Sequence, residues 1–178
     1  GRAIAKALAD EGAALVLADV DSDAGRRTAE ELGGRFVAAD VLVDDELRAL
    51  IAAAVGIEIL VNNAGGAPGP YYPEAPVERW SRTLDLNLRS TMLAMQLALE
   101  AMPTGGAIVN VSSIAGYGLA PHDAPEYAVA KAGVVRLTGA LSALVETRGV
   151  RVSCICPDWV DTPAVRRSLA AMSAEERG

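Results

Sequence analysis

Short apolar runs alternate with amphipathic segments of helical length along almost the whole chain. The first run, Ala-Leu-Val-Leu-Ala at 14–18, follows an opening amphipathic helix that ends near Gly12, and Asp19 comes directly after it. A continuous apolar run of this length is typical of a parallel strand that is buried on both faces. Parallel strands need crossover connections, which helices provide. The alternation therefore predicts an α/β fold over residues 1–178, with a doubly wound parallel sheet covered by helices on both faces.

The same alternation continues to the last expected strand. We expect helices at 22–32, 44–54, 76–101 and 125–147, and strands at 35–39, 58–61, 106–111 and 150–155. With 178 residues, of which 51% are apolar and 22% charged, the chain is long and apolar enough to bury one substantial core. We therefore predict a single domain.

Charge and composition argue against several classes of partner. The formal net charge is −7 and there is no long basic run, so we expect no nucleic acid partner. No apolar stretch reaches the ~18 residues that cross a bilayer, so we expect no membrane partner. Cys154 and Cys156 lie on one side of an expected strand, without further His or Cys ligands nearby. They are interpreted as buried free thiols of a cytoplasmic protein that binds no metal.

Polar and turn-forming residues follow each expected strand. Open parallel sheets bind ligands outside the carboxyl ends of their strands, where the loops face a crevice. Ordinary loops also contain such residues, so any one of them is weak evidence. Their position at the same edge of the sheet is what indicates a site. The residues are Asp19, Asp40, Asn62-Asn63-Ala64-Gly65, Ser112-Ser113 and Pro157-Asp158.

Tyr127 and Lys131 lie four residues apart in an expected helix, so they share one face. A phenol has a pKa near ~10, and about 4 kcal/mol of preference for the phenolate would bring that pKa close to neutrality. A cation ~4 Å away supplies about 4 kcal/mol at an effective dielectric of ~20, but only about 1 kcal/mol in water. In a dry cleft the pair predicts a general acid and base for an alcohol or carbonyl oxygen. The alternative is a surface tyrosine with an incidental lysine.

Four motifs in this order resemble the short-chain dehydrogenase/reductase family. They are Asn62-Asn63-Ala64-Gly65, Asn87 within Leu-Asp-Leu-Asn-Leu, Val-Asn-Val-Ser-Ser-Ile-Ala-Gly at 109–116, and Tyr127-x-x-x-Lys131. The resemblance implies a Rossmann-like fold in which Ser113 orients the substrate oxygen and Tyr127 transfers the proton. It also implies that Lys131 lowers the pKa of Tyr127 and holds the nicotinamide ribose, and that Asn87 anchors a water in a helix distortion. Ser113 is preferred over Ser112 because the family pattern places the catalytic serine ahead of two residues and a glycine, here Gly116.

The resemblance also implies a bound dinucleotide. Asp19 lies 18 positions beyond Gly1, where a carboxylate accepts from the adenosine ribose hydroxyls and repels a ribose phosphate. Val20 supplies no cation for such a phosphate, so NAD is expected rather than NADP. Two alternatives stay open, because Asp19 could cap the next helix, as Ser22 or Asp23 could, and Asp40 could be a turn residue. The implied cofactor-binding residues are Gly1, Asp19, Asp40, Val41, Asn62, Ala64, Gly65, Tyr127, Lys131, Pro157, Val160 and Thr162.

The sequence departs from the family pattern at several places. Asp158 stands where the family has glycine, the chain joins the strand after Ile57 about one turn early, and the loop from Gly116 to Tyr127 is one residue longer. The family's first strand, most of its glycine loop and its last strand are missing. Because a doubly wound sheet without its middle strand leaves hydrogen-bonding groups unmatched, we expect the domain to be incomplete at both ends. The intact mass is then expected to exceed the 18.4 kDa of this sequence.

These observations predict an NAD-dependent oxidoreductase of a secondary alcohol or ketone. One alternative is an NADP-dependent carbonyl or ketoacyl reductase, with which Asp19 conflicts. Another is a dinucleotide sensor that has the fold without turnover. The apolar helices at 76–101 and 125–147 suggest that subunits also bury surface there, and the family likeness implies a homotetramer before a homodimer.

Overall fold

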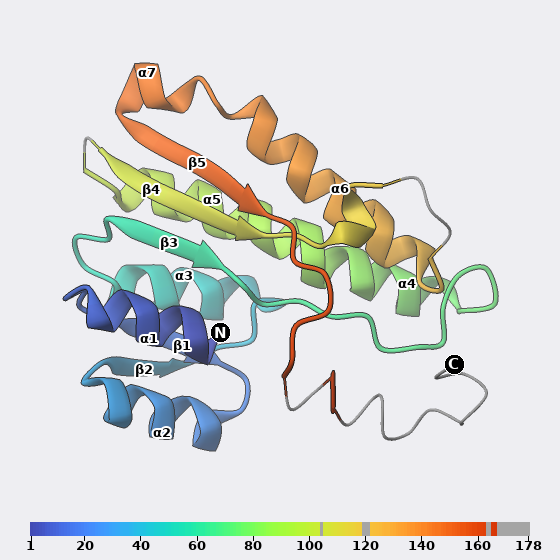
Figure 1. Ribbon diagram of the computed structural model, residues 1–178, viewed down its shortest axis with the longest axis horizontal. Coiled ribbons are helices and arrows are strands. Elements are labelled where there is room, and N and C mark those ends of the chain that lie inside the picture. Colours follow the sequence, from blue (N-terminus) through green and yellow to red (C-terminus); the bar gives the residue numbers. More distant parts are fainter. Residues whose placement is uncertain (104, 119–121, 163–164, 167–178) are drawn as a thin grey trace.

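Helices and strands alternate along the chain as the sequence predicts (Figure 1). The computed structural model describes residues 1–103, 105–118, 122–162 and 165–166. The elements, in order, are α1 (Arg2–Asp10), β1 (Val16–Asp19), α2 (Ser22–Leu32), β2 (Arg35–Ala38), α3 (Asp44–Ala53), β3 (Ile59–Asn62), α4 (Val77–Leu84), η1 (Asp85–Arg89), α5 (Ser90–Ala101), β4 (Gly106–Val111), η2 (Ile114–Gly116), α6 (Pro125–Ala140), α7 (Leu144–Arg148) and β5 (Val150–Ile155).

All strand pairs are parallel, but the strands form two sheets. One contains β1 and β2, and the other has the order β3-β4-β5. The prediction that the strand at 14–18 is buried on both faces is wrong, because Val16 and Leu17 are half-buried and Ala18 is exposed. Among the described residues, β1 pairs with β2 alone, so its other edge has no strand partner. Parallel pairing places the carboxyl ends of the strands within each sheet at one edge.

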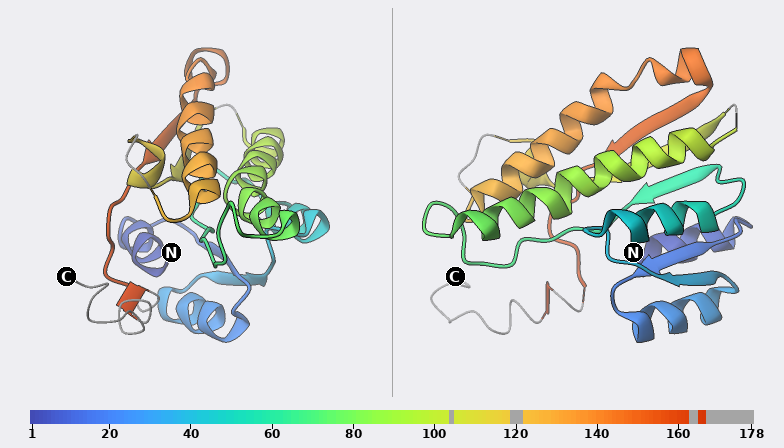
Figure 2. Two further views of the ribbon diagram at one scale, coloured as in Figure 1. Left: turned by 90° about the vertical axis from the view of Figure 1, so that its right-hand side faces the viewer. Right: turned by 180° about the vertical axis from the view of Figure 1, so that it is seen from behind.

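The main core lies between the three-stranded sheet and one layer of helices. Leu47 and Ile51 of α3 pack with Met95 of α5, Ile108 of β4 and Val150 of β5. Figure 2 shows α3 and α5 together on one side of the strands, with α1 on the other side. The core therefore fixes β3, β4 and β5 relative to the long helices that follow them.

One predicted helix is distorted, and another is shorter than predicted. The segment expected as one helix at 76–101 contains a π-helical turn, η1, between α4 and α5. At this turn, Nδ2 of Asn87 donates to the carbonyl oxygen of Thr83, which in a regular helix accepts from a backbone amide. The helix expected at 125–147 ends at Ala140, where the Leu141 amide is shared between the carbonyl oxygens of Leu137 and Thr138.

The cysteines are free but differ in exposure. Cys154 is half-buried in β5 and Cys156 is exposed, because it lies beyond the last residue of that strand. The prediction of two buried thiols is therefore wrong. The part of the chain that the structure describes holds no group of three or more His, Cys, Asp or Glu side chains suited to a metal ion. No described helix is both long and apolar enough to pass through a bilayer.

Candidate active site

The ends of β4 and β5 bring two predicted site segments together. Val111 pairs with Ile155, and the pairing continues beyond the strands. The Ser112 amide donates to the Ile155 carbonyl oxygen at 2.8 Å, and the Ile114 amide donates to the Pro157 carbonyl oxygen at 2.9 Å. The sheet edge thus places the Pro157 segment beside Ser113.

The two adjacent serines have different surroundings. Ser112 is 4% exposed, and its hydroxyl donates to the Lys131 carbonyl oxygen at 2.7 Å. Ser113 is half-buried, and its Oγ accepts from the Ala115 amide at 3.2 Å, which caps η2. Ser112 therefore links β4 to α6, whereas Ser113 remains the serine that can face a substrate.

Lys131 and Tyr127 lie together on α6, as their spacing predicts. The Lys131 side chain is almost completely buried, its Nζ donates to the Val111 carbonyl oxygen at 2.9 Å, and Nζ lies 5.6 Å from the centre of the Tyr127 ring. Burial lowers the pKa of Lys131 from its ordinary value of 10.5, with Cys154 acting in the opposite direction. The ammonium therefore faces a main-chain carbonyl and the face of the phenol ring.

The structure does not show the expected fall in the pKa of Tyr127. Burial raises the pKa of Tyr127 above 10.0, and a hydrogen bond with the Ser113 side chain acts against this rise. Burial of the phenol disfavours its charged form more than the surroundings favour it, and Lys131 is not among the causes of the shift. This direction differs from the expected one, and the role of Lys131 in lowering the pKa of Tyr127 stays a prediction.

Asn87 connects the predicted helix distortion to the loop after β3. Its Nδ2 donates to the Gly66 carbonyl oxygen at 2.7 Å, and its Oδ1 accepts from the Gly66 amide at 3.0 Å. A Cβ atom on Gly65 would lie 2.6 Å from Asn87 Oδ1 and 3.1 Å from Lys131 Nζ, so only glycine fits there. The distortion at Asn87 is present, and its amide holds this loop against the site.

The start of α1 meets the same loop from the other side. A Cβ atom on Gly1 would lie 3.3 Å from Asn63 Nδ2, so the Gly1 main chain lies close to the Asn63 side chain. Asp19 is exposed at the end of β1, and its Oδ1 accepts from the Asp21 amide at 3.0 Å. The cap of α2 is Asp21, which accepts from the Ala24 amide. The alternative in which Asp19, Ser22 or Asp23 caps that helix is therefore wrong.

A pocket of about 500 Å³ lies at the ends of β1 and β2 and is lined by Val20, Ala38, Ala39, Asp40 and Glu46. Asp40 Oδ1 accepts from the Leu42 amide at 2.9 Å, so Asp40 does have the turn role. The Asp40 amide donates to Glu46 Oε2 at 2.7 Å. Sequence reasoning missed Glu46, although acidic residues in a first helical turn often bond to nearby amides.

Asn62 is occupied within the sheet. Its Nδ2 donates to Asn110 Oδ1 at 2.8 Å, and the fully buried Asn110 donates in turn to Thr138 Oγ1 at 2.9 Å. These bonds join β3, β4 and α6, and the expected backbone contacts of Asn62 and Ala64 with a cofactor stay a prediction. The sequence contained a signal for Asn110, because an amide within a buried apolar strand must find partners.

The remaining predicted residues lie along the segment after β5. Pro157 is half-buried, Val160 is 50% exposed, and Thr162 Oγ1 accepts from the Val165 amide at 3.2 Å. Asp158 is exposed, and its φ is not positive, so this backbone accepts a side chain where the family has glycine.

Val41 is half-buried and packs against the main core. The structure therefore gives Val41 a packing contact.

Comparisons with known proteins cover almost the whole chain. The family model described as enoyl-(acyl carrier protein) reductase matches residues 1–177. Cis-4-hydroxycyclohexanecarboxylate dehydrogenase of Sinomonas cyclohexanicum is 38% identical over 93% of this chain and 70% of that protein. L-fucose dehydrogenase of Mus musculus is 33% identical over 99% of this chain and 67% of that protein. A short chain dehydrogenase structure from Mycobacterium smegmatis has a TM-score of 0.81 at 32% identity and covers 90% of this chain and 72% of that one.

Fold and relatives together define an oxidoreductase of alcohols and ketones with doubly wound α/β architecture. The chain belongs to the short-chain dehydrogenase/reductase family. It spans about two thirds of the length of the relatives that it matches.

Proposed function

We propose that this protein transfers a hydride between NAD(H) and a small secondary alcohol or ketone, with Tyr127 as the acid and base. The observation that carries the proposal is the meeting of Ser113, Tyr127 and Lys131 at the carboxyl edge of the sheet. Ser112 and Gly65 pack directly against Lys131, so this cluster is held by the surrounding main chain. An incidental surface lysine would not be almost completely buried.

The chain's own residues have the following roles in the proposal. Ser113 donates a hydrogen bond to the substrate oxygen. The raised pKa keeps Tyr127 protonated at neutral pH, so its phenol can donate a proton to a carbonyl oxygen. Oxidation of an alcohol requires the pKa of Tyr127 to fall, because the phenolate then accepts the proton of the alcohol. A cation close to the phenol oxygen lowers this pKa. Lys131 is the cation beside the ring. When bound, NAD supplies the hydride chemistry.

The residues around Gly1 and Asp19 fit a dinucleotide. A helix N-terminus without a Cβ atom suits a pyrophosphate, and the pocket at Val20 and Asp40 has the size for an adenine ring. Gly65, Pro157, Val160 and Thr162 would continue this path to Lys131. The two free thiols support a cytoplasmic setting, where thiols stay reduced.

The test of the reaction is turnover by wild type and Tyr127→Phe. Cis-4-hydroxycyclohexanecarboxylate, L-fucose and cyclohexanol would be offered with NAD, and reduced nicotinamide would be followed by absorbance. Loss of the phenol is expected to reduce kcat at least ~100-fold. Tyr117→Phe is the matched control, because Tyr117 is 78% exposed. Equal turnover by wild type and Tyr127→Phe would reject the assignment, and NADH binding without any turnover would support a sensor.

Cofactor choice is tested at Asp19. Asp19→Ala removes the exposed carboxylate that would accept from the ribose hydroxyls and repel a ribose phosphate. The KM for NAD is expected to rise about tenfold, as for one lost hydrogen bond to a charged group. The ratio of kcat/KM for NADP to that for NAD should rise, because the repulsion of the ribose phosphate is lost. Asp21→Ala is a control for loss of the α2 cap alone. A wild type that prefers NADP would overturn this role and favour the carbonyl or ketoacyl reductase.

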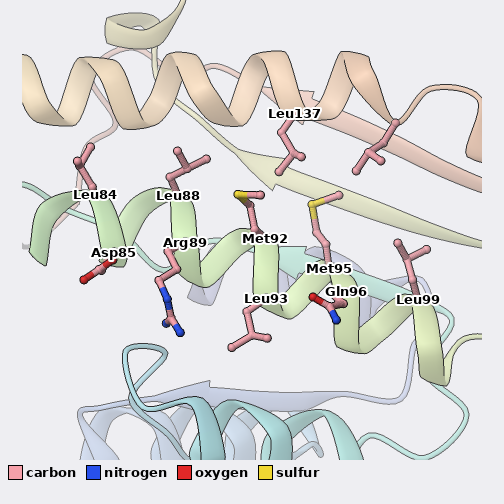
Figure 3. Close-up of a pocket in the computed structure, with 11 residues that line it drawn as sticks. Leu84, Asp85, Leu88, Arg89, Met92, Leu93, Met95, Gln96, Leu99 and Leu137 are labelled. Carbon is pink, nitrogen blue, oxygen red and sulfur yellow. The ribbon is translucent and has the colours of Figure 1, made fainter. Parts of the chain in front are cut away.

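We also propose that the protein is a homo-oligomer, first a tetramer and then a dimer. A groove of about 580 Å³ runs between α4, η1 and α5 on one side and α6 on the other. Figure 3 shows Leu88, Met92 and Met95 pointing toward Leu137 across it, whereas Asp85 and Arg89 point away from α6. An apolar surface of this kind is typical of the centre of an interface, and a second copy can use the same patch about a two-fold axis.

A further inference from the structure

The segment from Gly66 to Ala75, here called the strap, runs from the end of β3 to the start of α4 (Figure 1). It has hydrogen bonds of its own. The Tyr71 hydroxyl donates to the Ala67 carbonyl oxygen at 3.3 Å, and the Ala75 amide donates to the Tyr71 carbonyl oxygen at 2.8 Å. These bonds lie within the strap, so they do not fix its position relative to the helices.

Two side chains from helices hold the strap. Asn87 of η1 bonds both the amide and the carbonyl oxygen of Gly66. Glu126 of α6 accepts from the Tyr72 amide through Oε2 at 3.3 Å. Asn87 thus fixes the start of the strap, and Glu126 fixes its middle. Glu126 directly precedes Tyr127 in the sequence.

Glu126 is unusual for its position. It is the second residue of α6 and only 6% exposed, whereas Glu78, the second residue of α4, is exposed. Glu126 Oε1 is buried without a hydrogen-bond partner among the residues that the structure describes. A buried carboxyl group with so few partners costs stability, so packing alone does not account for its presence.

We propose that Glu126 is a positioning residue that sets the distance between the strap and the helix carrying Tyr127. The role rests on the proposed function in one respect, because the strap borders the substrate only if Tyr127 is the acid and base. The Tyr72 amide is bonded to the residue that precedes Tyr127, so a shift of the strap moves the exposed Tyr72 side chain relative to the start of α6. Glu126 then acts on substrate binding through Tyr72, without touching the reacting atoms.

The first test is hydrogen exchange on the full chain without substrate. In Glu126→Ala, exchange of the 66–75 peptide is expected to rise about tenfold, as for one lost hydrogen bond to a carboxylate. Exchange of α6 beyond its first turn should stay unchanged. Glu126→Gln retains an acceptor oxygen and should keep most of the protection, and Glu78→Ala is the control at the same helical position. If the 66–75 peptide of Glu126→Ala exchanges at the wild-type rate, the proposal is overturned. A rise in exchange throughout α6 as large as that of the 66–75 peptide would overturn it as well.

The second test is steady-state kinetics with whichever alcohol of the panel wild type oxidises fastest. Glu126→Ala is expected to raise the KM for that alcohol about tenfold, while kcat and the KM for NAD change less than about twofold. Glu126→Gln should restore the KM. Equal losses for alcohol and NAD would contradict a positioning role. If wild type turns over no alcohol, the proposed function fails, and hydrogen exchange still decides whether Glu126 holds the strap.

Discussion

Burial acts in opposite directions on the two ionisable side chains at the centre of the site. It lowers the pKa of Lys131 and raises that of Tyr127, because in each case the charged form loses hydration. Burial therefore favours the neutral phenol and destabilises the cation beside it. The energetic cost of keeping Lys131 charged can be measured through its effect on folding.

We predict that Lys131→Met changes how stability depends on pH. Between the lowered pKa of Lys131 and its ordinary value of 10.5, the unfolded chain binds more protons than the folded one. The free energy of unfolding of wild type therefore rises with pH through this window, and the variant lacks that rise. Urea denaturation at several pH values up to 10.5 measures the difference, from which the contributions of groups distant from Lys131 cancel.

The same variant is expected to lose at least ~100-fold in kcat. Lys6→Met is the control, because Lys6 is exposed and paired with Asp10 on α1. A stability difference between wild type and Lys131→Met that stays constant with pH would show that the lysine is hydrated in the folded protein.

At the residue scale, the sequence predicts which side chains meet and not what they bond to. The spacing of Tyr127 and Lys131 places them on one face, and the structure agrees. That Lys131 bonds to Val111, or that Glu126 is buried under the strap, depends on segments that are distant in sequence. Local patterns contain no information about such contacts.

At the scale of elements, the short helix η2 is packed tightly against α6. A Cβ atom on Gly116 would lie 2.4 Å from the Lys131 carbonyl carbon and 2.5 Å from the Ala132 amide nitrogen. Both are backbone atoms of a helix, so they can move away only if the helix itself shifts. The contact fixes the distance between Ser113, which caps η2, and the part of α6 that carries Lys131.

Gly116→Ala is therefore expected to separate these two elements. We predict a loss of roughly 1–3 kcal/mol in the free energy of unfolding, typical of overpacking, together with a lower kcat. Gly139→Ala is the matched control within α6, where the nearest atom would lie 3.9 Å away. It should gain about 0.5–1 kcal/mol, because alanine favours a helix. Denaturation and turnover of both variants provide the measurement, and effects of the same sign would contradict this contact.

Element types were predictable because their apolar patterns are local. The strands β4 and β5 and the helix α2 have the predicted bounds. The π-helical turn at η1 was implied by family resemblance alone. Its cause lies in Asn87, whose amide bonds to both Thr83 and Gly66, so a contact across the fold alters the helix. Helical periodicity does not reveal such a competitor.

At the scale of the whole molecule, the alternation of elements predicts layers and not neighbours. The pattern indicated parallel strands, but it does not say which strands pair, and the described residues form the separate sheets β1–β2 and β3-β4-β5. The close approach of Gly1 to Asn63 connects the two parts beside the candidate cofactor site. The apolar groove between α5 and α6 is the other feature at this scale.

Assembly through that groove can be tested at Met92. Met92 is 49% exposed in the groove, so Met92→Glu removes little packing from the isolated chain. In an interface formed by two copies about a two-fold axis, the same change buries two unpaired carboxylates. Each unpaired buried charge costs about 3–5 kcal/mol, which weakens association by at least ~100-fold.

Light scattering coupled to size exclusion should therefore show wild type as a tetramer or dimer and Met92→Glu as a smaller species at micromolar concentration. Val145→Glu is the matched control, because Val145 is 48% exposed on α7 and lies outside the groove. It should keep the wild-type mass. The melting temperature of diluted Met92→Glu should stay close to that of equally diluted wild type, which separates lost assembly from lost folding. An unchanged mass for Met92→Glu, or a monomeric wild type, would show that this groove does not join subunits.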